Sequence, residues 1–166
     1  MPNLPKPLKI SPLWSAELED IAQVEEAHST DPLSLPQLRV MWESQAPVGA
    51  IGAYRGKEHV RHLVFGRQGR SWWIASLLVL PSQRRQGVGG ALLYGLMKYI
   101  PAGKRLHAVV RDTNREGQEF LKRMGFQAIR VLPSRFSNPP ADGYLFVGEP
   151  SVVLTKHEPV PSQANP

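Results

Sequence analysis

The sequence predicts an α/β (α+β) fold in which a central mixed, mostly antiparallel sheet is flanked by helices. The apolar run at residues 71–80 is typical of a strand buried on both faces, and Pro81 ends it. Three glycines follow, at positions 87, 89 and 90, and after them apolar residues repeat at helical spacing up to Pro101. Shorter strands and helices are predicted on both sides of this strand-turn-helix unit.

The N-terminal half is predicted to contain a strand, two helices and a hairpin. Ser29-Thr30-Asp31-Pro32 separates the two helices, and Gly56-Lys57 forms the turn of the hairpin. The predicted elements are the strand Leu8 to Ile10, the helices Ala16 to Ala27 and Leu35 to Trp42, and the strands Val48 to Tyr54 and His59 to Phe65.

The C-terminal half is predicted to add one more helix and the remaining strands. The helix begins near Asp112 and runs to Met124, because Thr113 and Glu116 have the spacing of a capping box and Gly125 favours a stop. Residues 133–148 are rich in Pro, Gly and Ser, which predicts a loop. The remaining strands are expected at 106–110, 128–132 and 151–156.

Length and composition fit one domain. A chain of 166 residues with 42% hydrophobic content is long enough to bury a core, and we expect a domain at 1–156 followed by a flexible tail at 157–166. Neither a long apolar run nor a cationic, apolar leader is present, which predicts a cytoplasmic protein without a membrane partner. The absence of cysteine excludes disulfides, a cysteine nucleophile and thiolate metal sites.

The histidines do not predict a metal centre. His59 and His62 lie close in the sequence, but on a regular strand they would face opposite sides of the sheet. We therefore expect no metal ligands in this chain.

Charge is distributed unevenly along the chain. Residues 1–50 carry three basic and seven acidic side chains, and residues 51–166 carry seventeen basic and seven acidic ones, so that −4 and +10 give the net charge of +6. A basic C-terminal part is compatible with nucleic acid, but also with a ligand that carries several phosphates. The basic residues are dispersed and lack the aromatic interleaving of a single-strand binding surface, which makes nucleic acid the weaker interpretation.

The turn Arg84-Arg85-Gln86-Gly87-Val88-Gly89-Gly90 is the strongest functional signal. Glycines leave the first amides of the following helix unshielded, and the helix dipole favours an anion there. The dinucleotide fingerprint is incomplete, because Leu92 stands where a third glycine belongs, and the Gly-Lys-Ser/Thr of a P-loop is missing. The alternative is a tight turn in which the glycines serve backbone geometry alone.

The spacing Arg84-x-x-Gly87-x-Gly89 resembles the Arg/Gln-x-x-Gly-x-Gly/Ala motif of the GNAT superfamily of N-acetyltransferases, with Val79-Leu80-Pro81 before it and Ala91-Leu92-Leu93 after it. The resemblance implies the GNAT fold and acetyl-CoA as cofactor. It also implies that two neighbouring strands diverge to admit this cofactor. The residues it assigns to the pyrophosphate are Arg84, Arg85, Gln86, Gly87, Val88, Gly89 and Gly90, and those along the pantetheine and acetyl group are Leu77, Leu78 and Val79.

Two further segments resemble the same superfamily. Residues 110–126 are similar to its second motif, in which an asparagine opens a helix and a Gly-Phe pair closes it, so Asn114 either contacts the cofactor or only caps the helix. Residues 24–34 resemble, more loosely, a segment of the ribosomal-protein alanine acetyltransferases, although Thr30 and Leu33 replace aromatic residues. This branch of the superfamily acetylates the α-amino group of a protein.

The usual acid and base of that branch are absent. By the resemblance, a glutamate belongs where Val109 stands and a tyrosine where Leu121 stands, and neither residue present transfers protons. Two residues are candidate substitutes. His107 lies on the same face of the predicted strand as Val109, and Tyr144 lies in the predicted loop. Further candidates are Glu25 and Glu26 for binding or deprotonating an amine, and one ring of the pair Trp72 and Trp73 for walling the acceptor site.

Together these features predict an acetyl-CoA-dependent N-acetyltransferase that modifies a primary amine by direct transfer in a ternary complex. A peptide or protein N-terminus is favoured over a small amine as the acceptor. The missing acid and base leave open a catalytically silent acyl-CoA-binding module that regulates a protein partner. A nucleic-acid-associated protein remains the third interpretation.

Overall fold

A single seven-stranded sheet runs through the computed structural model, which describes residues 6–45 and 47–150. Its strands are β1 (Leu8–Leu13), β2 (Val48–Arg55), β3 (Glu58–Gln68), β4 (Ser71–Val79), β5 (Leu106–Arg111), β6 (Gln127–Ser137) and β7 (Pro140–Gly148). The strand order is β1-β2-β3-β4-β5-β7-β6, and only the β4–β5 pair is parallel. The predicted mixed, mostly antiparallel sheet is confirmed.

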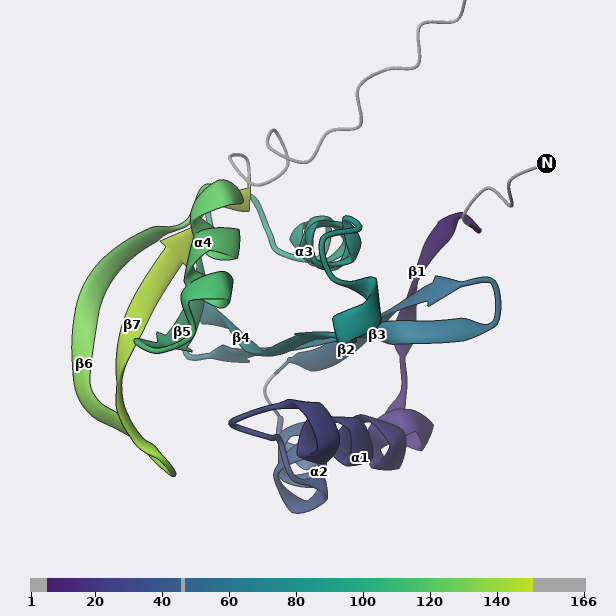
Figure 1. Cartoon of the computed structure of the whole chain (residues 1–166), viewed down its shortest axis with the longest axis horizontal. Coiled ribbons are helices and arrows are strands. Elements are labelled where there is room, and N and C mark those ends of the chain that lie inside the picture. Colours follow the sequence, from purple (N-terminus) through teal and green to yellow (C-terminus); the bar gives the residue numbers. More distant parts are fainter. Residues whose placement is uncertain (1–5, 46, 151–166) are drawn as a thin grey trace, which may run out of the picture.

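Four helices cover the two faces of this sheet. They are α1 (Leu18–His28), α2 (Leu35–Glu43), α3 (Val88–Met97) and α4 (Arg115–Arg123), and two short 3₁₀ turns lie at Ser15–Glu17 and Pro81–Gln83. Figure 1 shows α1 and α2 on one face and α3 and α4 on the other. No helix in the described ranges has the length and apolar character needed to cross a membrane.

Each face has its own apolar core. Leu92, Leu93 and Leu96 of α3 are fully buried in the larger cluster, together with residues of β3, β5, α4 and β7. Ile21 of α1 and Leu38 of α2 are fully buried in the smaller cluster on the opposite face. The cores hold both helix pairs against the sheet, so the positions of the helix ends are fixed by packing.

Side chains cap two of the helices. Ser34 and Gln37 form a reciprocal capping box at the start of α2. At the start of α4 the cap is Asn114, whose side chain accepts a hydrogen bond from Gly117 N at 2.9 Å. The predicted capping box of Thr113 and Glu116 is therefore wrong, because the helix begins one residue later than that spacing assumed.

The predicted loop at 133–148 is also wrong, since β6 and β7 form a long antiparallel hairpin there. Several of the residues that predicted a loop, Pro133, Ser134 and Pro139, lie at irregular points of the hairpin. The register shifts between Leu132 and Phe136, Ser134 has a positive φ, and the Asn138-Pro139 peptide bond is cis. The strand predicted at 151–156 lies outside the described residues.

His59 and His62 both face α1, contrary to the prediction that they face opposite sides. The register shifts between Ala53 and Tyr54, and Arg61 opposite them has φ 140°. This bulge adds a residue and restores the second histidine to the same face. No group of three or more potential metal-ligating side chains is found in the described part of the chain.

The parallel strands β4 and β5 separate soon after they begin to pair. Their ladder contains only Trp72 opposite Leu106 and Trp73 opposite His107. Beyond these pairs, β4 stays paired with β3 up to Val79, and β5 is paired with β7 along its length. Among the described strands, none pairs with the β5-facing edge of β4 beyond Trp73.

Candidate functional site

The chain turns sharply between the end of β4 and the start of α3. Gly87 precedes the first residue of α3 with φ +78°, a conformation that side chains rarely adopt. A Cβ atom built on Gly87 has no heavy atom within 4 Å. The next residue, Val88, is buried in the core and anchors the helix. The first amides of α3 are thus presented at an open surface, which is the geometry of an anion site.

Side chains of the turn itself hold its shape. Arg84 Nε donates to Val79 O at 3.2 Å, and Gln86 Nε2 donates to Ser82 O at 2.9 Å. Arg84 also forms an ion pair with Glu116 of α4 at 3.6 Å. Arg85 is exposed and has φ 58°. Two positive charges therefore stand beside the unshielded amides, and one of them links the turn to α4.

Arg55, at the end of β2, supports the turn from behind. Its Nε donates to Gln83 Oε1 and its Nη2 to Gln86 O, both at 3.2 Å, and its Nη1 donates to Lys6 O at the same distance. Sequence reasoning missed this residue. Arg55 and the turn residues that it contacts are about thirty positions apart, so no local sequence pattern indicates their interaction.

Helix α4 packs against the start of α3, and the Arg84–Glu116 ion pair links its first turn to the glycine turn. A Cβ on Gly89 would come within 3.2 Å of the ring of Phe120, so glycine allows the two helices to approach closely. Asn114 opens α4 as its cap, and its side-chain oxygen is occupied by Gly117 N. The structure thus brings together the two sequence motifs that were predicted to share one ligand.

The edge of β4 completes this side of the site. Leu77 and Val79 direct their side chains into the core beneath α3, and Leu78 is buried and paired in register with His62. The backbone at these positions lies where β5 has already diverged. An extended ligand with amide groups therefore has a strand edge beside it and the glycine turn at its end.

A profile of the acetyltransferase (GNAT) family matches residues 8–126, most of the described chain. The chain belongs to the GNAT family. The glycine turn, the diverging strands and the α4 cap all lie within the matched region. No curated protein matches the sequence significantly.

Solved structures of other GNAT proteins share the fold. The ribosomal-protein-S18-alanine N-acetyltransferase of Escherichia coli superimposes with a TM-score of 0.73 at 17% identity, over 86% of this chain and 94% of that one. NAA60 of Arabidopsis thaliana, in complex with a bisubstrate analogue, gives 0.73 at 19% identity over 86% and 98%. Ard1 of Thermoplasma volcanium gives 0.71 at 18% identity over 86% and 97%. At these identities the comparison shows the fold alone.

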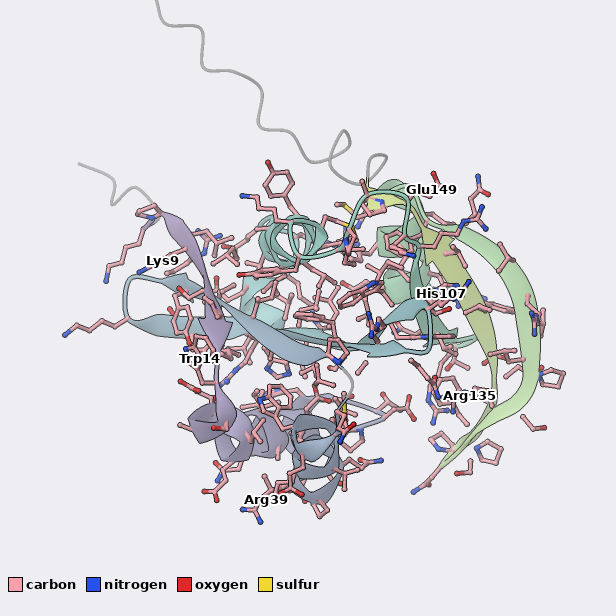
Figure 2. The ribbon with its side chains drawn as sticks, turned by 180° about the vertical axis from the view of Figure 1, so that it is seen from behind. Lys9, Trp14, Arg39, His107, Arg135 and Glu149 are labelled. Carbon is pink, nitrogen blue, oxygen red and sulfur yellow. The ribbon has the colours of Figure 1, made fainter. Side chains whose placement is uncertain are left out.

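The GNAT fold places His107 and Tyr144 on opposite faces of the sheet. His107 of β5 is labelled in Figure 2. It stacks on Trp73 with ring centroids 4.8 Å apart, and its Nδ1 lies 3.1 Å from Trp72 O. Tyr144 lies on β7, not in a loop, and packs against the core on the α3 and α4 side. The structure does not bring these two candidates together.

The positions of the absent acid and base are apolar in the structure as well. Leu121 is buried in the core under α4. Val109 is half-buried on β5, and a Cβ on Gly143 of the neighbouring strand would come within 2.9 Å of its side chain. Neither side chain can therefore give or take a proton.

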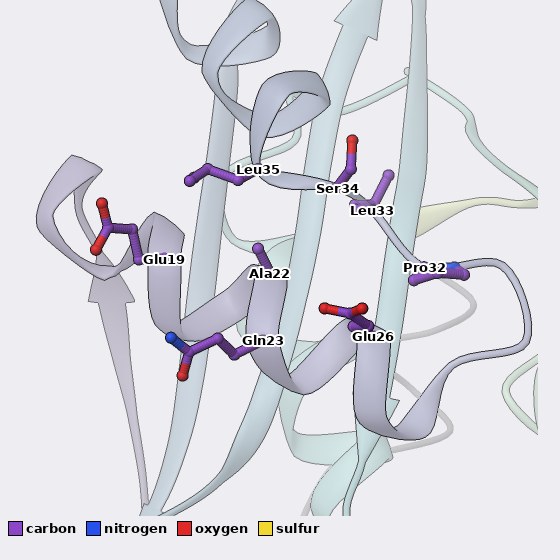
Figure 3. Close-up of a pocket in the computed structure, with 8 residues that line it drawn as sticks. All are labelled: Glu19, Ala22, Gln23, Glu26, Pro32, Leu33, Ser34 and Leu35. Atoms are coloured by element: carbon purple, nitrogen blue, oxygen red, sulfur yellow. The ribbon is translucent and has the colours of Figure 1, made fainter.

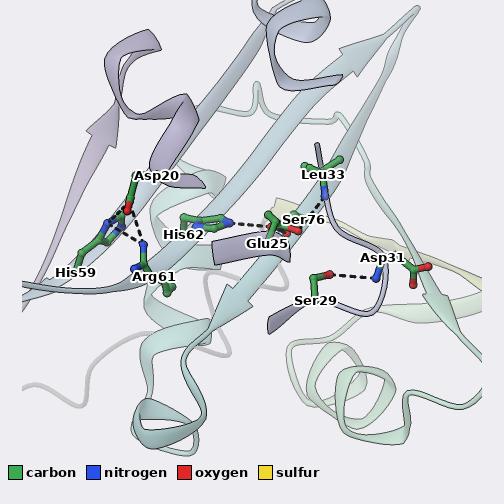
Figure 4. Close-up of polar contacts among 9 residues, drawn as sticks. All are labelled: Asp20, Glu25, Ser29, Asp31, Leu33, His59, Arg61, His62 and Ser76. Atoms are coloured by element: carbon green, nitrogen blue, oxygen red, sulfur yellow. Dashed lines mark hydrogen bonds and ion pairs between the residues drawn. The ribbon is translucent and has the colours of Figure 1, made fainter. Parts of the chain in front are cut away.

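The two glutamates of α1 point in different directions. Glu25 is fully buried and contacts His62, Ser76 and the backbone of Leu33 (Figure 4). Glu26 is exposed and lines a hollow of about 450 Å³ between α1 and the segment that leads into α2 (Figure 3). The hollow lies on the outer side of α1, so Glu25 alone belongs to the sheet side of the helix.

A buried arginine, Arg111, is the last residue of β5 and connects two loops. Arg111 donates from Nε and Nη2 to the two carboxylate oxygens of Asp31 at 2.7 and 2.8 Å, and to the carbonyls of Asn138 and Pro139 at 3.0 and 2.7 Å. The hydrogen bond with Asp31 raises the pKa of Arg111 above its ordinary value. The α1–α2 loop and the β6–β7 turn are therefore fastened to one side chain.

The two tryptophans of β4 lie on opposite faces of the sheet. Trp72 is buried in the core beneath α3, where it contacts Phe65. Trp73 stacks on His107 on the other face. Its Nε1 is buried and lacks a hydrogen-bond partner in the part of the chain that the structure describes.

Proposed function

We propose that this GNAT protein transfers an acetyl group from acetyl-CoA to a primary amine, with a peptide or protein N-terminus favoured over a small amine. The observation that carries the proposal is the edge of β4 beyond Trp73, where β5 has diverged, beside the open turn at Gly87. A strand edge pairs with amides and a glycine turn binds phosphates, and acetyl-CoA contains both groups in one extended molecule.

In this proposal Arg84 to Gly90 bind the pyrophosphate, and the backbone of Leu77 to Val79 aligns the pantetheine and acetyl group. Asn114 supports the cofactor from the start of α4, whose first turn is linked to the glycine turn by the Arg84–Glu116 ion pair. Acetyl-CoA supplies an acyl group activated as a thioester. The chain supplies position and hydrogen bonds.

The acceptor reaches the thioester from the face that carries α1 and α2, because the cofactor motifs occupy the face of α3 and α4. A protein N-terminus is favoured for two reasons. Residues 24–34 resemble the alanine acetyltransferases, and one protein of similar fold is a ribosomal-protein-S18-alanine N-acetyltransferase. One neighbour is Naa50 of Arabidopsis thaliana in complex with the bisubstrate analogue CoA-Ac-MVNAL, at a TM-score of 0.73 and 16% identity.

A silent acyl-CoA-binding module is the second candidate. Val109 and Leu121 favour it, because both are apolar where a base and an acid are usual in the alanine-acetyltransferase branch. This candidate binds acetyl-CoA in the same place but does not turn it over. The two functions therefore differ in turnover and not in cofactor affinity.

A thermal-shift titration tests cofactor binding. Acetyl-CoA and CoA are expected to raise Tm in a concentration-dependent manner, because a ligand that selects the folded state stabilises it by about 2.7 kcal/mol at one hundred times its Kd. An unchanged Tm with both acetyl-CoA and CoA would contradict both the transferase and the silent acyl-CoA-binding module.

A thiol-release assay then separates the two candidates. Acetyl-CoA is incubated with peptides that begin with alanine, serine or methionine and with small primary amines, and CoA release is followed. Release with at least one peptide, together with mass-spectrometric acetylation of its α-amino group, supports the transferase. Tight cofactor binding without release on any acceptor supports the silent module.

A further inference from the structure

Three polar side chains from three elements meet on the sheet side of α1. Glu25 of α1 and His62 of β3 are fully buried, and Ser76 of β4 is half-buried. Glu25 Oε1 forms hydrogen bonds with His62 Nε2 at 2.8 Å and with Ser76 Oγ, as Figure 4 shows. Glu25 Oε2 accepts a hydrogen bond from Leu33 N at 3.2 Å. The carboxylate is thus held by three partners in a fixed place.

A carboxylate at this depth is costly unless charge and hydrogen bonds compensate it. Within residues 6–45 and 47–150, no lysine or arginine forms an ion pair with Glu25, and His62 is its only ionisable partner. His62 Nδ1 is buried and has no hydrogen-bond partner among the same residues. Ser76 Oγ donates its hydrogen bond to Glu25 Oε1, so the hydroxyl proton has a carboxylate oxygen in direct contact to which it can move.

The position of Ser76 connects this buried carboxylate to the proposed reaction. Ser76 directly precedes Leu77 to Val79 and lies on the α1 face, whereas Leu77 and Val79 point to the α3 face. Ala75 beside it is exposed. A polar hydroxyl therefore stands at the open edge of β4, on the side from which the amine arrives.

His107 lies farther from this point along the strand. It is in register with Trp73, at the closed end of the diverging strands, four residues before Leu77. At about 3.3 Å per residue this places it roughly 13 Å from the level of Leu77. Its Nδ1 also faces the carbonyl of Trp72.

On the basis of the proposed function, we propose that Ser76 and Glu25 form the proton relay that replaces the missing base. The amine nitrogen forms its bond to the acetyl carbon and gives one proton to Ser76 Oγ, while the Ser76 hydroxyl proton passes to Glu25 Oε1. Ser76 is unchanged, and Glu25 gains one proton that later returns to solvent. The carbon–sulfur bond breaks, and the sulfur leaves as a thiol with a proton from solvent.

In this relay Ser76 is the catalytic residue, because its hydroxyl contacts the amine. Glu25 acts through Ser76, and His62 and the Leu33 amide are positioning groups that fix the carboxylate. General base catalysis of this kind contributes about 10²–10⁴ to a rate.

The experiment compares Ser76→Ala and Ser76→Thr with the matched control Ser71→Ala, which removes a half-buried hydroxyl from the other end of β4. The acceptor is the fastest peptide of the panel above. Ser76→Ala is expected to lower kcat about 100-fold with KM and the acetyl-CoA thermal shift unchanged. Ser76→Thr restores kcat to within about tenfold of wild type, and Ser71→Ala stays within about twofold.

A second readout needs no turnover. In the ligand-free protein, the imidazole nitrogen resonances of His62 are expected to move in Ser76→Ala and to stay in place in Ser71→Ala, because Ser76 and His62 share one carboxylate oxygen. Unmoved His62 resonances in Ser76→Ala would show that the groups are not coupled and would overturn the relay.

The outcomes separate the relay from the function itself. A wild type that acetylates a peptide while Ser76→Ala is equally fast overturns the relay alone. Loss of kcat that is accompanied by a lower Tm and weaker acetyl-CoA binding assigns Ser76 a structural role and also overturns it. A wild type without turnover on any acceptor overturns the proposed function and the relay together.

Discussion

Gly87 has a left-handed backbone conformation and lies at an open surface. Its φ of +78° suits glycine, and the space around its missing Cβ is empty to at least 4 Å. Gly69, in the turn between β3 and β4, has the same two properties with φ +60°. The two positions therefore carry the same backbone demand but lie at different places in the molecule.

This pair gives a test of the cofactor site. Gly87→Val and Gly69→Val are each expected to lower the free energy of unfolding by about 1–2 kcal/mol, because an L side chain is strained at positive φ. Gly87→Val alone is expected to weaken acetyl-CoA binding at least tenfold, measured by calorimetric titration. Equal acetyl-CoA affinity in both variants would contradict the assignment of the turn.

His59 makes the stability of the protein depend on pH. Burial, together with the nearby Arg61, lowers its pKa below the ordinary 6.5, and Asp20 at 3.5 Å opposes this only in part. The unfolded chain therefore takes up a proton at higher pH than the folded one. The contribution of His59 to stability is fully present above about pH 6.5 and is lost as the pH falls through the lower folded pKa.

The variant His59→Gln is expected to lose less stability than wild type between pH 7.5 and 5.5, because glutamine does not titrate in this range. Urea unfolding at several pH values measures the difference. Parallel curves for the two proteins across that interval would show that His59 does not contribute to the pH dependence.

At the scale of elements, α4 shows how one residue can have two roles. Asn114 caps the helix through its side-chain oxygen, and the Arg84–Glu116 ion pair links the first turn of α4 to the glycine turn. A cap can be kept while the amide group is removed, because serine caps helices about as well as asparagine. Capping and cofactor contact are therefore separable.

Asn114→Ala is expected to lower the free energy of unfolding by about 1 kcal/mol, and Asn114→Ser to leave it nearly unchanged. If the amide supports the cofactor, both variants bind acetyl-CoA more weakly than wild type. Calorimetric titration and urea unfolding measure the two effects separately. Wild-type affinity in Asn114→Ser would make Asn114 a cap alone.

The elements that sequence predicted well are those with local signals. The strand at β4, the glycine turn and α3 follow from consecutive residues, and the order of the helices follows from apolar spacing. The β6–β7 hairpin was missed because Pro133, Ser134 and Pro139 resemble a loop in composition. In the structure they lie at a bulge and a turn of an edge strand, where ladder hydrogen bonds are not required.

At the scale of the whole molecule, the polar contacts on the α1 and α2 side of the sheet join distant parts of the chain. Arg111 and Asp31 are 80 positions apart, and Glu25 is 37 positions from His62 and 51 from Ser76. Composition and periodicity carry no information on such pairs. Sequence therefore predicted the glycine turn from a contiguous motif and Glu25 as a candidate, whereas only the fold revealed that Glu25 is paired with His62 and Ser76.

The Arg111–Asp31 pair is expected to hold two chain segments in place. Asp31→Ala leaves a buried guanidinium without its counter-charge and is expected to lower the free energy of unfolding by about 2 kcal/mol. Glu19→Ala breaks the exposed pair with Arg39 and is expected to cost less than about 0.5 kcal/mol. Urea unfolding compares the two.

Hydrogen exchange adds a local measurement to this comparison. In Asp31→Ala, amides of residues 29–34 and 134–143 are expected to exchange faster than in wild type, because both segments lose a shared attachment. Unchanged exchange in both segments would show that Arg111 does not fasten them.

Arg55 has a directional effect on the glycine turn. It binds the carbonyl oxygen of Gln86, and in a trans peptide the carbonyl and the following N–H point in opposite directions. The N–H of Gly87 is consequently aimed away from Arg55, toward the outside of the turn. The guanidinium of Arg55, at the turn of the β2–β3 hairpin, thereby fixes the orientation of a single peptide plane. Its removal would let that plane rotate without altering any residue of the motif.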